Sequence, residues 1–357
     1  MTLEFLPYHL NLKHTWTISS GAAQGGGTNV AAVVLVRLKD KSVAGLGEAP
    51  TSRRYSQSVA SIQEFLRLVD ASKLSFDDIP GSMAYLETLA PGNYSAKCAV
   101  NVALVDGAAR LAAQPVYDFL GLGFAENKHL TSYSIGIDTP EKIRLKVAEA
   151  APYPILKLKV GAPGDEENLA ALRQIDPTKT VRVDANEAWK TKEEALGHLQ
   201  RLGKDGNVEL VEQPMPASTP LEDLIWLKSR SPLPLFGDES CQNARDISKC
   251  AQCYHGVVVK LIKTGGITGA YETLQAARQA GLLTMIGCMI ETSILITAAA
   301  HLAEWTHHLD IDGNLLISND PYTGATAEKG AISFASTTEP VGLRVKSINT
   351  DPFGVRG

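Results

Sequence analysis

The sequence predicts an α/β protein in which a parallel (β/α) barrel follows a smaller α+β domain. Between Lys159 and Lys260, short apolar or β-branched runs end in charged residues at intervals of about 22 to 28 positions, and a helix-length segment follows each run. A (β/α)₈ barrel of ~250 residues is built from eight such units of ~30 residues. At 357 residues and 44% hydrophobic content, the chain is long enough for one barrel and a second domain.

Residues 1–125 are expected to form the α+β domain. The pattern is strand-like and then helical, over Leu3–His9, Lys13–Ile18, Asn29–Leu38, Ser56–Val69 and Tyr94–Ala113. The last of these segments carries alanines at the spacing of one helix face. Strands followed by helices are typical of an α+β domain.

A glycine-rich loop is expected at Ser19–Thr28. A phosphate-binding loop opens a helix, whereas this one precedes the apolar strand at Asn29–Leu38, so a phosphate site is rejected. A loop this rich in glycine is instead interpreted as a mobile flap.

Residues 126–319 are expected to form the barrel. Its strands are predicted at Thr131–Gly136, Ile155–Val160, Val181–Asp184, Val208–Glu212, Val257–Lys260, Met285–Cys288 and Leu309–Asp312, with a further strand end near Asp238. Function lies at the C-terminal ends of barrel strands, so the polar residues that close these runs should converge on one mouth. Beyond this cycle, residues 320–357 contain strand-like pieces that are expected to return to the first domain.

The overall composition excludes several classes of partner. A formal net charge of −5 with dispersed lysines offers no basic surface for nucleic acid. The sequence shows no signal segment and no apolar stretch of ~18 residues, so we expect a cytoplasmic protein with no membrane partner. Five cysteines form no even disulfide framework, which suits a reducing compartment.

Three acidic residues, Asp184, Glu212 and Asp238, each close a different predicted strand. Carboxylate oxygens are the ligands that Mg²⁺ prefers, and Mg²⁺ keeps open positions for water or substrate. Like charges held together on a barrel rim repel one another unless a cation neutralises them. The sequence therefore predicts one Mg²⁺ site per subunit.

Lys157 and Lys159 alternate along one strand, so both side chains point to the same face. If that face is the barrel interior, mutual repulsion and burial lower the pKa of one lysine toward neutral pH, as a general base requires. Lys260 lies four strands further on and should approach from the opposite side. Two bases on opposite sides of a carbon acid permit racemisation or epimerisation, and Mg²⁺ would stabilise the enediolate that forms.

These motifs resemble the enolase superfamily, in its muconate-lactonising subgroup, and most closely the dipeptide epimerases of that subgroup. The resemblance covers nearly the whole chain and rests on the following stretches: Lys157-Leu158-Lys159, Asp184-Ala185-Asn186, Val211-Glu212-Gln213-Pro214, Asp238-Glu239-Ser240 and Lys260 to Ile267. It implies a (β/α)₇β-type modified TIM barrel with an N-terminal α+β capping domain completed by the C-terminal segment. The general use of a Lys or His base with Mg²⁺ in this superfamily is known.

The resemblance also implies roles for single residues. Asp184, Glu212 and Asp238 would bind Mg²⁺, and Lys159 and Lys260 would be the two acid/bases. Support is expected from Lys157, which would tune Lys159, and from Asn186 and Glu239. Substrate contacts are expected at Ser134, Cys288, Met289, Arg54, Asp310 and Asp312.

Asp310-Ile311-Asp312 matches the D-x-D that dipeptide epimerases carry on the eighth strand, where it holds the ammonium group of the substrate. The implied reaction is 1,1-proton transfer at the α-carbon of the C-terminal residue of an Ala-Xaa dipeptide, with Xaa uncharged, hydrophobic or Glu. Epimerases acting on Ala-Glu can carry an arginine in the flap, which Ser19-Ser20-Gly21-Ala22 lacks, although Arg53 or Arg54 could substitute for it. The balance leans toward an uncharged second residue.

Three other functions fit these residues less well. A cycloisomerase or o-succinylbenzoate synthase of the same superfamily keeps the metal and the lysines but has no use for Asp310 and Asp312. A metal-dependent amidohydrolase would need an H-x-H motif on its first strand, where the chain has Tyr133-Ser134-Ile135. A non-catalytic binding barrel would not need two opposed lysines. The resemblance allows a homo-oligomer.

Overall fold

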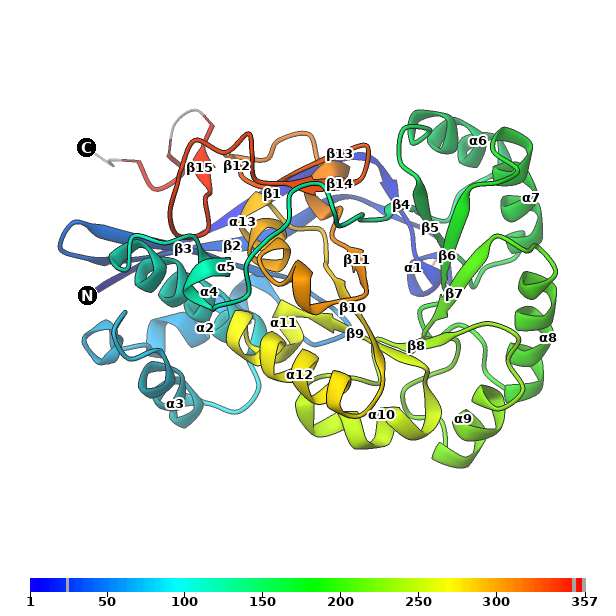
Figure 1. Ribbon diagram of the computed structural model, residues 1–357, viewed down its shortest axis with the longest axis horizontal. Helices are drawn as coiled ribbons and strands as arrows, with labels where there is room; N and C mark the ends of the chain where they lie inside the picture. The colour runs from blue at the N-terminus through cyan, green and yellow to red at the C-terminus, as the bar shows by residue number, and fades with distance from the viewer. Residues whose placement is uncertain (24–25, 349–350, 355–357) are drawn as a thin grey trace.

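Figure 1 shows the computed structural model, which describes residues 1–23, 26–348 and 351–354. A smaller domain, blue and cyan, lies at one end, and a larger green-to-orange barrel lies at the other. The expected flap falls partly outside the described residues, at positions 24 and 25. Of the rest, Ser19–Ala23 form the short helix α1. The flap's mobility stays a prediction.

The smaller domain is an α+β cap built on a three-stranded antiparallel sheet in the order β1-β2-β3. The strands are β1 (Thr2–Trp16), β2 (Thr28–Asp40) and β3 (Val43–Pro50). The prediction of two separate strands at Leu3–His9 and Lys13–Ile18 is wrong, because β1 runs unbroken and absorbs the irregularity as a register shift between Asn11 and Trp16.

Four helices accompany this sheet: α2 (Val59–Leu68), α3 (Ile79–Leu89), α4 (Tyr94–Leu111) and α5 (Val116–Phe119). Helix α4 lies directly on the sheet. A Cβ atom on Gly45 or Gly47 of β3 would come within 1.9 Å of the carbonyl oxygen of Ala103 or Ala99. The alanines of α4 and the glycines of β3 therefore allow two backbones to approach more closely than larger side chains would.

The barrel is an eight-stranded parallel sheet in sequential order. Its strands are β4 (Tyr133–Ile135), β5 (Ile155–Lys159), β6 (Thr180–Asp184), β7 (Val208–Glu212), β8 (Leu235–Gly237), β9 (Gly256–Lys260), β10 (Leu283–Gly287) and β11 (His308–Asp310). A parallel bridge from Thr131 to Leu309 joins the first strand region to the last. The sheet therefore closes, which brings residues of β11 beside those of β4.

Helices surround the barrel on its outer side (Figure 1). They are α6 (Pro140–Glu149), α7 (Asp165–Ile175), α8 (Lys192–Gly203), α9 (Leu221–Lys228), α10 (Ile247–Cys253), α11 (Leu261–Thr264), α12 (Ile267–Gln279) and α13 (Ser293–Ala300). Along β5, Leu156 and Leu158 belong to the apolar core, whereas the alternate residues Lys157 and Lys159 contact acidic side chains of other strands. This period of two is what a strand between a helical layer and a polar interior requires.

The C-terminal segment, red in Figure 1, runs back to the cap. It forms two small antiparallel pairs, β12 (Tyr322–Thr323) with β15 (Lys346–Ser347) and β13 (Thr326–Glu328) with β14 (Ala331–Ser333). Gly342 exchanges backbone hydrogen bonds with Gln114 and Val116 of the cap. The fold class predicted from the sequence is confirmed, while the exact domain boundaries at 125/126 and 319/320 stay predictions.

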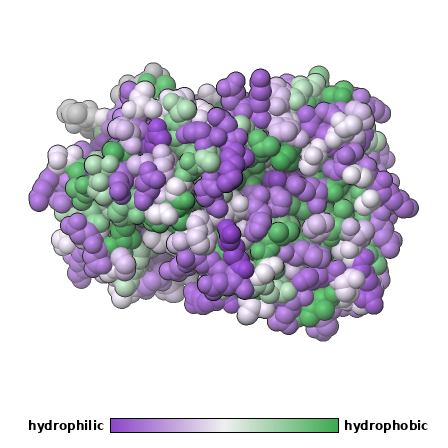
Figure 2. Space-filling view, in the orientation of Figure 1, coloured by the Kyte–Doolittle hydropathy of each residue, from purple (hydrophilic) through white to green (hydrophobic). Residues whose placement is uncertain are grey.

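Figure 2 shows hydrophilic and hydrophobic residues intermixed over the visible face of the molecule. Among the described helices, none is long and apolar enough to cross a membrane.

Candidate active site

The register of the parallel strands aligns the polar strand ends at one rim. Lys159 of β5 stands opposite Asp184 of β6, and Asp184 stands opposite Glu212 of β7. Glu212 in turn pairs with Phe236 of β8, two residues before Asp238. The spacing seen in the sequence thus becomes a row of adjacent side chains at the C-terminal edge of the barrel.

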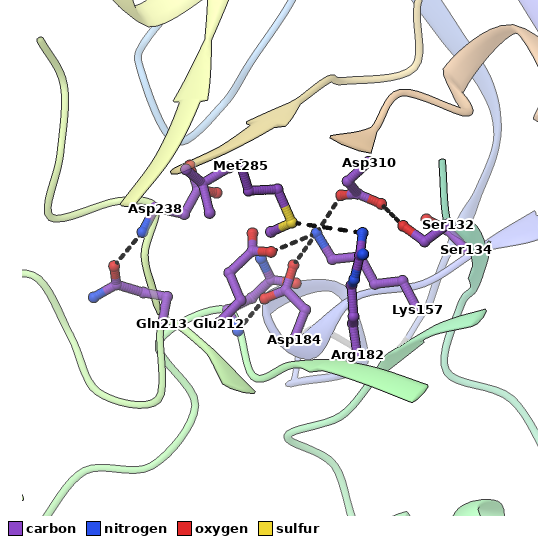
Figure 3. A network of polar contacts seen from close by, with 12 residues as sticks. Ser132, Ser134, Lys157, Arg182, Asp184, Glu212, Gln213, Asp238, Met285 and Asp310 are labelled. Atoms are coloured by element: carbon purple, nitrogen blue, oxygen red, sulfur yellow. Dashed lines mark hydrogen bonds and ion pairs between the residues drawn. The ribbon is translucent and has the colours of Figure 1, made fainter. Parts of the chain in front are cut away.

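Lys157 lies at the centre of a polar network inside the barrel (Figure 3). Its Nζ atom is 2.6 Å from Asp310 Oδ2, 2.7 Å from Glu212 Oε2 and 3.0 Å from Asp184 Oδ2. Lys159 approaches the same Asp184 oxygen, with its Nζ atom 2.6 Å away. Three carboxylates from three strands therefore meet around ammonium groups of β5.

Asp238 forms a second centre on the other side. Its Oδ2 atom is 2.9 Å from Nζ of Lys260, and its Oδ1 atom is 2.6 Å from Nζ of Lys263. Lys263 also donates to the carbonyl oxygens of Asp238 (2.7 Å) and Val258 (3.0 Å). The sequence showed Lys263 within the stretch from Lys260 to Ile267, but no role was predicted for it.

The acidic residues around these lysines determine their pKa values. Burial lowers the pKa of Lys157, but Asp184, Asp310 and Glu212 more than offset it, so that the pKa stands well above its usual range. The pKa of Lys260 is likewise raised against the effect of burial, by Asp238 and Glu212. The carboxylates around Lys157, at 2.6 to 3.0 Å from its Nζ atom, raise its pKa. The lowered pKa expected for one lysine of the K-x-K pair stays a prediction.

Several side chains of this site suit a divalent cation, because their buried oxygen atoms accept no hydrogen bond. Among the described residues, four buried oxygen atoms of this site accept no hydrogen bond: Glu212 Oε1 and Oε2, Asn186 Oδ1 and Glu239 Oε2. Buried acceptors are normally satisfied, and an oxygen-rich set with spare lone pairs suits Mg²⁺. Glu212 Oε2 lies within ion-pair distance of Lys157 without hydrogen-bond geometry.

In this structure the carboxylates turn toward lysines rather than toward one another. No three His, Cys, Asp or Glu side chains are gathered as a ligand set in the described part of the chain. The reason is electrostatic, since each carboxylate repels the next and is neutralised by an ammonium group. The roles of Asp184, Glu212 and Asp238 as ligands remain a prediction, which the spare acceptors of Glu212 support.

Gln213, which follows Glu212, holds two strand ends together. Its Oε1 atom accepts hydrogen bonds from the backbone N–H groups of Asp238 (2.9 Å) and Ser240 (3.0 Å), and its Nε2 atom donates to the carbonyl oxygen of Met215 (2.7 Å). Its backbone is left-handed, with φ of 38°. Gln213 appeared in the V-E-Q-P stretch, but the sequence gave no role to it, because Asp238 and Ser240 lie in the loop after the next strand, β8.

The D-x-D pair is buried and asymmetric. Asp310 accepts from Lys157 and, at 2.6 Å, from the hydroxyl of Ser132. Asp312 accepts from the backbone N–H (2.6 Å) and the hydroxyl (3.3 Å) of Ser134. Burial and the neighbouring Asp310 raise the pKa of Asp312 to about 7, whereas Lys157 holds the pKa of Asp310 below its usual range against the effect of burial.

Two loops of the cap reach the mouth of the barrel. Trp16, at the end of β1, places its ring centre 5.9 Å from Nζ of Lys159. The hydroxyl of Ser19, in α1, donates to the carbonyl oxygen of Asn186 at 3.0 Å. On the second loop, burial and the charge of Asp238 raise the pKa of Tyr55 far above its usual range.

The remaining predicted contacts lie at different distances from this network. Cys288 is half-buried, with its Sγ atom 4.0 Å from Asp312 Oδ1. Met289 is half-buried and donates its backbone N–H to Glu291. Arg54 is paired with Glu187 rather than with a residue of the inner site. Nδ2 of Asn186 donates to Glu239 at 3.4 Å.

A closed parallel barrel with a cap over a mouth of carboxylates and lysines defines an enolase-like enzyme fold. Residues 14–121 match the N-terminal domain of mandelate racemase and muconate lactonizing enzyme, and residues 141–332 match the enolase C-terminal domain-like family. The chain belongs to the mandelate racemase/muconate lactonizing enzyme family of the enolase superfamily.

Several relatives are similar over almost their whole length. An L-Ala-D/L-amino acid epimerase of Pedosphaera parvula is 60% identical over 97% of this chain and 100% of its own. An L-Ala-D/L-Glu epimerase of Bacteroides thetaiotaomicron is 35% identical over 93% of this chain and 85% of its own. Among solved structures, a dipeptide epimerase of Enterococcus faecalis complexed with Mg and L-Leu-L-Tyr matches with a TM-score of 0.87 at 29% identity, over 96% of this chain and 98% of that one.

Proposed function

We propose that this protein is a Mg²⁺-dependent dipeptide epimerase that removes and returns a proton at the α-carbon of the C-terminal residue. The observation that carries the proposal is the placement of two lysines. Lys159 ends β5 and Lys260 ends β9, four strands apart in a closed barrel of eight, so they stand on opposite walls. Similarity to dipeptide epimerases over nearly the whole chain supports the same reaction.

Asp184, Glu212 and Asp238 would hold the metal ion, with Asn186 and Glu239 beside them. When bound, Mg²⁺ would stabilise the negative charge that develops on the substrate carboxylate as the α-proton leaves. The chain's own part is to fix the carboxylates: Gln213 anchors the backbone of Asp238, and Lys263 holds its side chain.

The two lysines would divide the proton transfers between them. One Nζ atom takes the α-proton from one face, and the other Nζ atom gives a proton to the opposite face, which inverts the centre. Both side chains are less than one tenth exposed, at 7% for each residue, so water is largely kept from the reacting carbon. Trp16 covers the Lys159 side.

The D-x-D pair would bind the substrate's ammonium group. Asp310 and Asp312 are 4% and 2% exposed, and a buried carboxylate pair favours a cation over a neutral or anionic group. A cycloisomerase substrate has no ammonium group for this pair to bind. Dipeptides therefore fit the site better than the acids that other members of the superfamily use.

The proposal is tested by following the α-proton in D₂O. We expect wild-type protein with Mg²⁺ to epimerise Ala-Xaa dipeptides and to incorporate deuterium at the α-carbon, measured by mass spectrometry and ¹H NMR. Lys159→Ala and Lys260→Ala should each lose epimerisation by at least ~10²-fold, the usual contribution of a general base, and one of them should still exchange the proton of a single enantiomer.

Lys192→Ala is the matched control, because Lys192 forms an ion pair with Asp223 on the outer helices α8 and α9. This variant should keep wild-type rates. Wild-type epimerisation rates in both Lys159→Ala and Lys260→Ala would contradict the two-base mechanism.

We also propose a cytoplasmic location, which the five free thiols support, since reduced cysteines suit a reducing compartment. A homo-oligomer stays a prediction from the family resemblance.

A further inference from the structure

Arg54 was expected to contact an acidic side chain of the substrate, but it forms an ion pair with Glu187 of the barrel instead. Its Nε and Nη2 atoms donate to the two carboxylate oxygens of Glu187, at 2.7 and 3.0 Å. The fork-to-fork pairing satisfies the planar edge with which a guanidinium binds a carboxylate. A dipeptide carboxylate would have to compete with Glu187 for the same donors.

Glu187 is itself fixed more firmly than a surface residue. Its Oε1 atom also accepts the backbone N–H of Ala217 at 2.8 Å, and its side chain is 18% exposed, against 49% for Arg54. Its backbone is left-handed, with φ of 66°, directly after Asn186 with φ of 43°. Such backbone is uncommon for residues other than glycine, so Glu187 has a defined direction toward the cap loop.

The pair lies at the rim of the reaction site. Glu187 follows Asp184 by three residues on the loop after β6. Arg54 directly precedes Tyr55, and the charges of Asp238 and Lys260 affect the pKa of the Tyr55 phenol. The loop that carries Arg54 is closed at its base by two backbone hydrogen bonds of 2.8 Å between Ser52 and Gln57. A released Arg54 would therefore stay at the mouth rather than move away with its loop.

The lysines of the site also form ion pairs with acidic residues. Lys157 and Lys159 bind Asp184, and Lys260 binds Asp238. An acidic side chain on the second residue needs a free cation, and without one its burial is unfavourable.

We propose that Glu187 determines substrate specificity by keeping Arg54 in an ion pair, so that Arg54 does not bind the substrate. The site then favours dipeptides with an uncharged second residue over dipeptides with an acidic one. This inference rests on the proposed function, because it concerns the side chain of the dipeptide whose α-carbon is epimerised. Glu187 acts through Arg54 and touches no substrate, so it is a positioning residue.

The test compares kcat/KM for L-Ala-L-Val and L-Ala-L-Glu. Wild-type protein should favour L-Ala-L-Val by about tenfold or more. Glu187→Gln keeps an oxygen for the N–H of Ala217 but loses the charge that holds Arg54, so it should narrow that preference by about tenfold, the usual range for a hydrogen bond to a charged group. The gain should appear mainly as a lower KM for L-Ala-L-Glu.

Arg54→Met in the Glu187→Gln background should cancel the gain, because the released guanidinium is what binds the acid. Arg54→Met alone should change the preference by less than about twofold, and this variant should fold, because the side chain of Arg54 is 49% exposed. If Arg54→Met alone lowers turnover of L-Ala-L-Glu by tenfold relative to L-Ala-L-Val, Arg54 already serves the substrate and the inference is overturned.

Two controls separate the pair from general charge effects. Asp205→Asn removes the charge of a comparable carboxylate in the turn after α8. Asp205 binds Arg173 of α7 at 2.8 and 2.6 Å and also accepts the N–H of Asn207 at 3.2 Å. Arg53→Met removes the neighbouring exposed arginine. Neither should shift the preference.

An unchanged preference in folded Glu187→Gln, or a wild-type preference for L-Ala-L-Glu, would also overturn the inference. Failure of the wild-type protein to epimerise either dipeptide would instead contradict the proposed function.

Discussion

Replacing Lys263 with methionine should expose how much the buried ion pairs contribute to the stability of the barrel. Lys263 is 2% exposed and its ammonium group donates to Asp238 Oδ1, Asp238 O and Val258 O at 2.6 to 3.0 Å. Methionine has a similar length and no charge. The change therefore removes three hydrogen bonds while largely keeping the packing of the side chain.

The expected loss follows from these contacts. Breaking a buried pair by removing one partner costs ~3–5 kcal/mol, because the remaining charge lacks compensation. Here Lys260 stays 2.9 Å from Asp238 and supplies part of that compensation. We therefore expect Lys263→Met to lower the free energy of unfolding by roughly 3 kcal/mol, and the melting temperature by several degrees.

Urea and thermal unfolding followed by circular dichroism measure this loss. Lys260→Met is the comparison, because Lys260 makes one contact with Asp238 and should cost less. Titration calorimetry with Mg²⁺ should also show weaker binding to Lys263→Met, since the oxygens of Asp238 lose the group that orients them. A stability within ~0.5 kcal/mol of wild type, together with unchanged Mg²⁺ affinity, would refute this account of Lys263.

Three further predictions concern buried titratable groups. Burial and the charge of Glu291 raise the pKa of Glu48 to about 8, although Glu48 accepts hydrogen bonds from Thr292. The stability that Glu48 contributes is therefore present below its unfolded pKa of about 4.5 and is lost as the pH rises toward 8. Relative to Glu48→Gln, the unfolding free energy of the wild-type protein should fall by roughly 3 kcal/mol between pH 5 and 8. The ring of His301 lies between the N–H of Tyr117 and the carbonyl oxygen of Leu343, and burial lowers its pKa to about 3. Stability should therefore fall as the pH drops from 6.5 toward 3, because the buried ring must then accept a proton. The melting temperature of His301→Gln should depend less on pH over that range. Asp312→Asn should raise KM at least about tenfold for a dipeptide with a free ammonium group and change it much less for the N-acetylated dipeptide; equal effects on both would exclude an ammonium contact.

The sequence predicted the barrel well because its evidence is local and periodic. Lys159, Asp184 and Glu212 each end an apolar run, and parallel pairing of successive strands then places them in one row. Strand β3 was not foreseen, since Gly45 and Gly47 give it an atypical strand pattern. Those glycines make sense only against α4, which lies more than 40 residues further on in the sequence.

The partners of single side chains were harder to foresee than the strands that carry them. The contact of Lys263 with Asp238 joins α11 to the residue after β8, and the pairing of Arg54 with Glu187 joins two domains. The motif that contains Lys263 does not indicate its partner, and Arg54 lies in no motif. The raised pKa of Lys157 could not be foreseen for the same reason, because the three carboxylates that cause it come from other strands.

Because the barrel closes, one residue, Lys157, contacts both the predicted metal ligands and the D-x-D pair. Lys157 of β5 binds Glu212 at one end and Asp310 at the other, although 153 positions separate Lys157 from Asp310. Its ammonium group thus already compensates Asp310, while no lysine lies against Asp312, whose oxygens accept only neutral donors of Ser134 and Cys288 among the described contacts. An incoming ammonium group therefore gains more from Asp312 than from Asp310. For the same reason Asp310→Asn should cost more in stability than Asp312→Asn, since it leaves one of the partners of a buried lysine without charge.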